Sequence, residues 1–156
     1  MTLKIVTDST CDLPQDVINA LGITIVPLYI NIGEKGYLDG VDITRKEFYT
    51  GLPNYKSHPT TGTPGIDSFS HAYARLAFQG ATEILSIHIS KSLSATVEVA
   101  ESAANAFDAV PVTVRDSGQL STGTGFQVET AARLAQQGKS LEDILQALDD
   151  LGKRTF

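Results

Sequence analysis

Short runs of β-branched residues alternate with helical patterns along this sequence, and this alternation restricts the fold more than any other feature. Strands are predicted at residues 3–6, 23–26, 84–89 and 110–114. Because long helical segments connect them, the strands are expected to be mostly parallel, with right-handed crossovers. The predicted fold class is therefore α/β, a mostly parallel sheet flanked by helices.

Capping residues and apolar periodicity indicate the helices. Pro14 suits a first helical turn, and Gly22 suits the end of that helix. Thr44 and Glu47 form a capping-box pattern for a short helix up to Gly51. Later helices with an apolar stripe are predicted at residues 66–80, 97–107, 121–137 and 140–151.

The region between the second strand and the helix predicted at residues 66–80 is less regular. Residues 28–32 are expected to be extended, and residues 31–36 resemble a hairpin. Residues 53–62 are predicted to be a polar loop, because two prolines and a glycine interrupt any periodicity. Thr63 and Pro64 are then typical of the N-cap and the first turn of the next helix.

Composition and charge exclude several classes of function. The 156 residues fit one domain, and the net charge of −6 comes without a Lys/Arg cluster, which argues against nucleic-acid binding and docking to an anionic membrane. No apolar run approaches the roughly 20 residues of a membrane helix. The start of the chain lacks a signal-peptide pattern, so a cytoplasmic protein is expected.

Hydroxyl-rich segments lie at or near the ends of three predicted strands and in the polar loop. In parallel α/β sheets, ligands bind beyond the carboxyl ends of the strands. Hydroxyls and helix N-termini together can hold a carboxylate or phosphate without a Lys or Arg. The alternative is that these side chains only cap helices. The candidate ligand-binding residues are Asp8, Ser9, Thr10, Thr61, Ser92, Ser94, Thr96, Ser117 and Gly118.

Patterns for catalysis, cofactors or metals are weak. Neither a Gly-x-Ser-x-Gly elbow nor a phosphate-binding or dinucleotide-binding glycine motif occurs. His58, His71 and His88 are too dispersed for a zinc site, so no cofactor or metal is expected. His88 is interpreted as a half-buried, hydrogen-bonded residue, and His71 as solvent-exposed.

Two residues after the first strand have a structural interpretation. Asp8 is expected to accept hydrogen bonds from neighbouring loop amides. A phosphatase-like role is disfavoured, because the second aspartate of such sites is replaced by Thr10. Cys11 has no neighbouring cation in the sequence that would activate it, so it is interpreted as an inert small residue.

Taken in order, several segments resemble the DegV family along nearly the whole chain. They are Ile5-Val6-Thr7-Asp8-Ser9-Thr10, Ile25-Val26-Pro27-Leu28, Asp39-Gly40-Val41-Asp42-Ile43, Thr60-Thr61-Gly62-Thr63-Pro64, Ile87-His88-Ile89-Ser90, Leu93-Ser94-Ala95-Thr96 and Asp116-Ser117-Gly118-Gln119. The family usually reads Ser-Gly-Thr where this chain has Ser94-Ala95-Thr96. It usually reads Ser-Gln-Pro-Ser where this chain has Gly62-Thr63-Pro64-Gly65.

The resemblance implies a two-domain carrier that encloses one long-chain fatty acid and presents its carboxylate to a fatty-acid kinase. Thr61 and Ser94 would bind the carboxylate, and the kinase would bind ATP and transfer the phosphoryl group, so the chain is not expected to be an enzyme. Residues 1–156 would correspond to the N-terminal domain. The family's second domain, with its basic residues, a histidine and one cavity wall, would be absent, and this chain alone would retain little or no lipid.

Two other functions remain open from the sequence. An α/β enzyme acting on a small phosphorylated or carboxylated metabolite would require a polar cleft and an acid–base pair. Asp8 and Asp116 are its candidates, but no basic partner is evident in the sequence. A regulatory or interaction domain would use the Ser and Thr segments only as helix caps.

Overall fold

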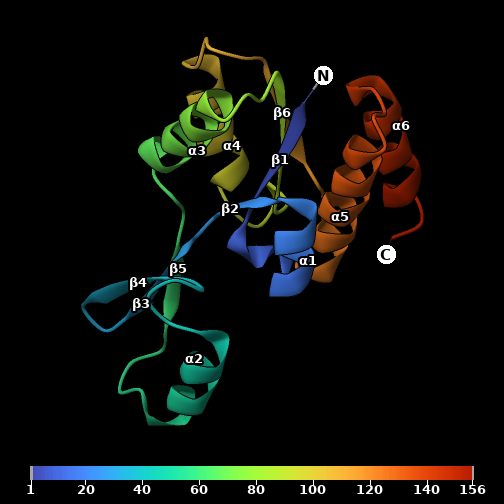
Figure 1. Ribbon diagram of the computed structural model, residues 1–156. Helices are drawn as coiled ribbons and strands as arrows, with labels where there is room; N and C mark the ends of the chain where they lie inside the picture. Colours follow the sequence, from blue (N-terminus) through green and yellow to red (C-terminus); the bar gives the residue numbers. More distant parts are fainter. Residues whose placement is uncertain (1, 156) are drawn as a thin grey trace.

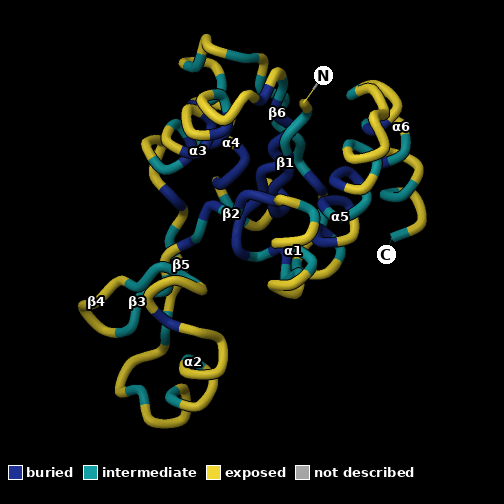
Figure 2. The backbone as a smooth tube through the Cα atoms, viewed as in Figure 1, coloured by how far each residue is buried: buried dark blue, intermediate teal, exposed yellow. Residues whose placement is uncertain are grey.

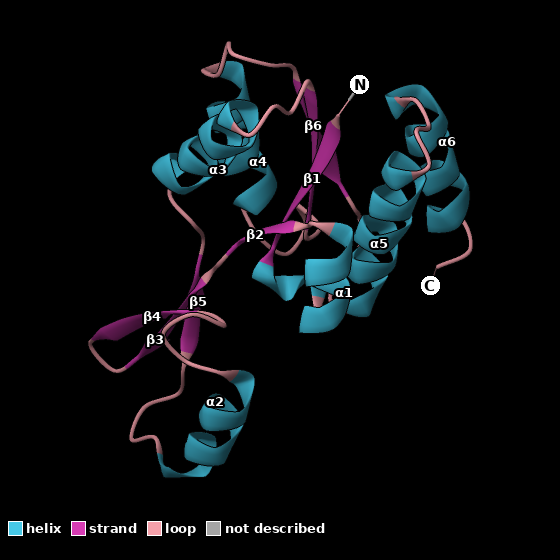
Figure 3. Cartoon of the chain, in the orientation of Figure 1, coloured by secondary structure: helices cyan, strands magenta, loops and turns pink. Residues whose placement is uncertain are grey.

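The computed structural model describes residues 2–155 and contains two sheets and six α-helices within that range (Figure 1, Figure 3). Met1 and Phe156, the ends of the expected domain, lie outside the described residues. In the described part of the chain, no helix has both the length and the apolar character needed to cross a membrane.

The larger sheet is parallel throughout, as predicted. Its strand order is β2 (Thr24–Val26), β1 (Leu3–Asp8), β6 (Glu83–His88) and β7 (Val112–Asp116). The first strand runs two residues further than predicted, because Thr7 and Asp8 still pair with neighbouring strands. The last strand begins two residues later than predicted, because its pairing with β6 starts at Val112.

Helices cover both faces of this sheet (Figure 1). One face carries α1 (Gln15–Leu21), α5 (Thr122–Gln136) and α6 (Leu141–Gly152), and the other carries α3 (Ile66–Phe78) and α4 (Thr96–Asn105). Successive strand residues point to opposite faces, which divides the core into two clusters.

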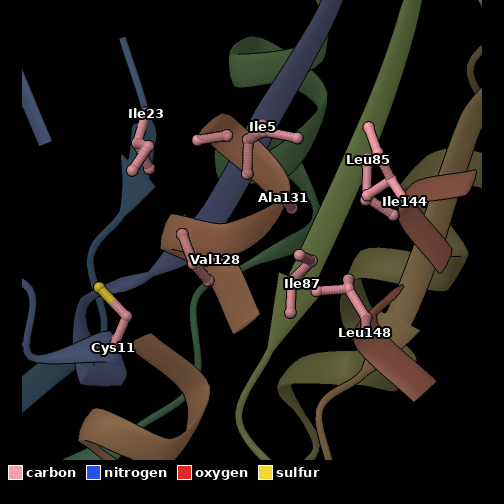
Figure 4. Packing of buried hydrophobic residues seen from close by; sticks show 10 residues of the cluster. Ile5, Cys11, Ile23, Leu85, Ile87, Val128, Ala131, Ile144 and Leu148 are labelled. Atoms are coloured by element: carbon pink, nitrogen blue, oxygen red, sulfur yellow. The ribbon is translucent and has the colours of Figure 1, made fainter. Parts of the chain in front are cut away.

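The first cluster packs strand residues against α5 and α6 (Figure 4). Ile5, Leu85 and Ile87 contact this layer, which includes Val128 and Leu148. The second cluster joins Val6 and Ile84 to α3 and α4, with Phe69 and Tyr73 as its largest side chains. Both clusters come from the alternation of strand and helix patterns that the sequence displays.

The smaller sheet is antiparallel and stands away from the main body together with α2 (Arg45–Gly51) (Figure 2). Its order is β4 (Lys35–Leu38), β3 (Tyr29–Ile32) and β5 (Thr60–Gly62), which confirms the hairpin. The prediction of a loop over 53–62 was wrong at two places. Residues Leu52–Asn54 form a 3₁₀ turn, η2, and β5 pairs with β3. Strand β5 is short and largely exposed, so it lacks the apolar alternation that marks a strand.

Most predicted helix ends are confirmed. The side chains of Thr44 and Glu47 cap α2 reciprocally, the Ser140 hydroxyl accepts from the amide of Asp143, and Gly22 ends α1 with a left-handed backbone. The prediction that Thr63 and Pro64 begin a helix was wrong. Thr63 and Pro64 lie outside the helix, the N-cap residue Gly65 is extended, and α3 begins at Ile66.

Candidate functional site

A groove of about 340 Å³ lies between the carboxyl end of β1 and the smaller sheet. Most of the surface that its walls expose is apolar, although apolar and polar residues are equally numerous in the lining. The apolar lining is Leu28, Tyr29, Ile30, Phe48, Tyr49, Pro59 and Leu120, and the polar lining is Thr10, Asp12, Asp39, Arg45, Thr60, Thr61 and Ser121. Such a lining can shield a hydrocarbon chain and hold a polar group at chosen points.

Two of the predicted site residues, Thr10 and Thr61, line this groove. Thr10 belongs to the 3₁₀ turn η1 (Ser9–Cys11) after β1, and Thr61 lies on β5, which pairs with β3 beside the groove. They are far apart in sequence, and the pairing of β5 with β3 is what brings Thr61 here. The exposure of Tyr49 (66%) and Leu120 (52%) means that the groove is open to solvent.

The predicted residues after β6 form a separate hydroxyl cluster. The Ser94 Oγ lies 2.8 Å from the Thr96 Oγ1 and also accepts from the Thr96 amide at the start of α4. Thr96 is fully buried, whereas Ser92 is exposed and Ser94 is partly buried. None of the three belongs to the described lining of the groove. A ligand contact from Ser94 therefore stays a prediction.

The predicted residues after β7 are held mainly by local hydrogen bonds. The Ser117 hydroxyl lies 3.0 Å from the Thr124 Oγ1 and accepts from the Gln119 amide. Gly118 has φ 62°, a left-handed backbone that glycine adopts readily, and its amide donates to Asp116. Their geometry is that of a tight turn into α5, and a role in ligand binding stays a prediction.

Asp8 is fully buried and accepts several hydrogen bonds. Its carboxylate accepts from the amides of Thr10 and Ile89, both at 3.0 Å, as the sequence predicted for loop amides. Burial would raise the pKa of Asp8, but the hydrogen bonds from His88, Thr10 and Ile89 outweigh it and lower the pKa. Asp8 is thus a buried anion, and Ser9 beside it accepts from the amide of Leu28.

His88 lies deeper in the structure than its position in the sequence predicted. It was expected to be half-buried, but its side chain is fully buried. Its Nδ1 lies 3.0 Å from the Asp8 Oδ2, so Asp8 has the basic partner that the sequence did not reveal. The available signal was a histidine at the end of a strand rich in isoleucine and leucine, although the neighbouring strand could not be identified from it. His71 is exposed, as predicted.

Asp12, Arg45 and Ser121 form a polar junction on the groove wall that sequence reasoning missed. Asp12 accepts from the guanidinium of Arg45 and from the hydroxyl of Ser121, and Arg45 also donates to the carbonyl of Ser9 at 2.9 Å. Among the described non-glycine residues, Asp12 and Ser121 are the ones with positive φ, 53° and 57°. Such backbone strain is commonly found at functional sites.

In the part of the chain that the structure describes, no three His, Cys, Asp or Glu side chains gather as metal ligands would. The site is defined instead by its open apolar groove, its hydroxyls and the loops at the strand ends.

Sequence comparison identifies the family. A family model described as "Uncharacterised protein, DegV family" matches residues 2–156. The chain belongs to the DegV family.

Relatives of this DegV chain agree in sequence and in fold. A DegV domain-containing protein from Deinococcus radiodurans is 42% identical over 149 residues, which are 96% of this chain and 52% of the relative. A DegV family protein from Thermus thermophilus, described by its fatty acid binding, is 41% identical with a TM-score of 0.89, covering 98% of this chain and 54% of that one.

A third relative names a particular ligand. A stearic acid-binding protein from Eubacterium ventriosum is 30% identical to this DegV chain, with a TM-score of 0.86, covering 94% of this chain and 52% of that one. The chain therefore spans about half the length of the relatives that it matches. The mostly parallel α/β fold expected from the sequence is confirmed by these similarities.

Proposed function

We propose that this chain provides the carboxylate-binding half of a fatty-acid carrier, which presents the bound acid to a fatty-acid kinase for acyl-phosphate formation. The observation that carries the proposal is the apolar groove lined by Thr61 of β5 and by Thr10, which follows β1. The fatty-acid binding described for the Thermus and Eubacterium relatives supports the same ligand class.

The two parts of a fatty acid would be held by different forces. Burying each methylene against the groove contributes about 0.8 kcal/mol, so the hydrocarbon tail dominates the affinity. Thr61 and Ser94 would donate hydroxyl hydrogen bonds to the carboxylate, assisted by backbone amides at helix N-termini. Ser94 does not belong to the groove lining. A carboxylate that contacts both Thr61 and Ser94 would therefore extend beyond the groove.

The chain itself would perform no chemistry in this proposal. ATP binding and phosphoryl transfer would belong to the kinase, and the carrier would act in the cytoplasm. The alternative hypothesis is an enzyme that acts on a small metabolite. The Asp8–His88 pair does not support it, because neither side chain has an exposed surface on which a metabolite could bind. A buried pair of this kind is better suited to organising loops than to transferring protons to a substrate.

The test is titration of the purified chain with stearic acid, with mass spectrometry of an organic extract to quantify the bound lipid. The Thr61→Ala, Ser94→Ala double variant is expected to bind about tenfold or more weakly, because it removes two hydrogen bonds to a charged group. The control is Thr82→Ala with Ser102→Ala, which removes two exposed hydroxyls that bond only to nearby backbone groups.

Two results would refute the proposal. One is that the chain takes up no stearic acid under conditions in which the stearic acid-binding Eubacterium relative does. The other is that the double variant and the control bind equally well. Formation of an acyl phosphate after addition of a bacterial fatty-acid kinase and ATP tests the presentation step separately.

A further inference from the structure

A hydrogen-bond network of four buried side chains runs from helix α3 to the carboxyl end of β1. The Tyr73 hydroxyl donates to the Ser86 Oγ at 3.0 Å, and the Ser86 Oγ lies 2.7 Å from the His88 Nε2. The His88 Nδ1 in turn lies 3.0 Å from the Asp8 Oδ2. All four side chains are fully buried, and the Phe69 ring packs edge-on against the His88 imidazole.

When His88 is protonated on Nδ1 alone, every donor in this hydrogen-bond network points toward Asp8. In this protonation state, the Tyr73 hydroxyl donates to Ser86, and the Ser86 hydroxyl donates to the His88 Nε2. The His88 proton is then on Nδ1, where it donates to the Asp8 carboxylate. Every polar side-chain atom of these four residues then has a partner, as a buried network requires.

Asp8 also accepts hydrogen bonds from two loops, the one after β1 and the one after β6. Its Oδ1 accepts from the amide of Thr10 at 3.0 Å and from the Thr10 hydroxyl at 2.5 Å, and its Oδ2 accepts from the amide of Ile89 at 3.0 Å. Thr10 lines the groove. Ile89 begins the loop that continues through Ser90, whose carbonyl accepts from the amide of Ser94.

We propose that His88 and Asp8 are positioning residues, which hold the loops after β1 and β6 in the geometry that binds a fatty-acid carboxylate. The inference rests on the proposed function and adds residues that act through Thr10 and the 89–94 loop. The order Asp, His, Ser matches a nucleophilic triad, but Ser86 is fully buried and has no access to a substrate.

Two substitutions of His88 separate positioning from simple packing. The side-chain nitrogen of asparagine is the same number of bonds from Cβ as Nδ1, and that of glutamine matches Nε2. His88→Asn therefore keeps a donor toward Asp8, whereas His88→Gln loses it. The control Tyr73→Phe removes the hydroxyl at the end of the network farthest from Asp8 and leaves the His88 donor to Asp8 in place.

Two readouts are measured on the full chain under conditions in which urea unfolding curves show every variant to be folded. One is the affinity for stearic acid, and the other is amide hydrogen exchange at Thr10 and Ile89. His88→Gln is expected to weaken stearic acid binding about tenfold and to accelerate exchange at both amides. His88→Asn and Tyr73→Phe are expected to stay within about twofold of the unmodified chain in affinity.

The proposal is overturned if the Asn and Gln variants behave alike in exchange and affinity, or if Tyr73→Phe weakens binding as much as His88→Gln. If the unmodified chain binds no stearic acid, the proposed function fails, and hydrogen exchange alone decides the positioning role. Faster exchange at Thr10 and Ile89 in His88→Gln but not in His88→Asn then supports it, and equal exchange rejects it.

Discussion

At the scale of single residues, the contact between η1 and α5 explains why Cys11 is buried. Gly125 on α5 faces the carbonyl oxygen of Cys11, and an added Cβ would overlap that oxygen. The missing side chain lets the helix approach the turn, and Cys11 beneath it is only 2% exposed. Burial raises the pKa of Cys11 to about 11, so its interpretation as an inert small residue is supported.

The first prediction concerns the reactivity and pH dependence of Cys11. At pH 8, alkylation of the native chain should be at least about a hundredfold slower than that of free cysteine, because so little thiolate forms. Urea should restore the normal rate. The folded-state pKa is raised from 9.0 to about 11, so the stability is complete below pH 9 and falls as pH rises toward 11.

The effect on stability can be isolated with Cys11→Ala. Between pH 9 and 10, the unmodified chain should lose about 1 kcal/mol more of its unfolding free energy than the variant. Tyr73, whose pKa burial raises from 10.0 to about 12, begins to lower the stability in the same way near pH 10, but both proteins contain it, so its effect cancels in the comparison. Equal slopes for the two proteins would show that Cys11 does not titrate in this way.

At the scale of elements, α2 is attached to the main body by polar contacts rather than by a core. None of its residues is buried. Its first residue, Arg45, reaches across to Asp12 and to the carbonyl of Ser9, and Ser121 holds Asp12 from the other side. The junction therefore sets the position of α2, which supplies Phe48 and Tyr49 to the groove.

Arg45→Ala is expected to loosen α2 without unfolding the protein. The global unfolding free energy should change by about 1 kcal/mol or less, because the Arg45 side chain is half exposed. Amide exchange over Arg45–Gly51 should accelerate. Arg133→Ala, which removes an exposed ion pair within α5, is the matched control and should leave exchange in α2 unchanged. Equal protection of α2 in both variants would contradict this role of Arg45.

At the scale of the whole molecule, two packed cores surround the larger sheet, and the groove lies outside both. Ile144 and Leu148 close one core and Phe69 and Tyr73 the other, so the fold does not need a ligand to complete it. The groove is different, because exposed apolar side chains such as Tyr49 and Leu120 form part of its wall. A lipid tail bound there would remain partly in contact with water.

Lipid retention is therefore expected to differ between this chain and longer relatives. After identical purification, mass spectrometry should find less than one equivalent of fatty acid on this chain and about one on the stearic acid-binding relative from Eubacterium ventriosum. The physical reason is the lower apolar area that an open groove can bury. Equal amounts of lipid on the two proteins would show that the groove alone is sufficient.

Local sequence determined most elements of this fold and the order in which they occur. Alternating strand and helix patterns predicted the parallel sheet, and the capping residues Thr44 and Ser140 marked helix starts, because these signals depend on residues only a few positions apart. The ordered hydroxyl segments likewise placed Thr10 and Thr61 among the candidate site residues.

Tertiary structure decided what those elements bring together. Strand β5 exists because β3 offers it a partner, and the loop prediction failed for that reason. His88 reaches Asp8 across 80 residues of sequence, and Ser121 reaches Asp12 across 109. Such contacts depend on strand register and helix packing over the whole molecule, and no local pattern of residues encodes them.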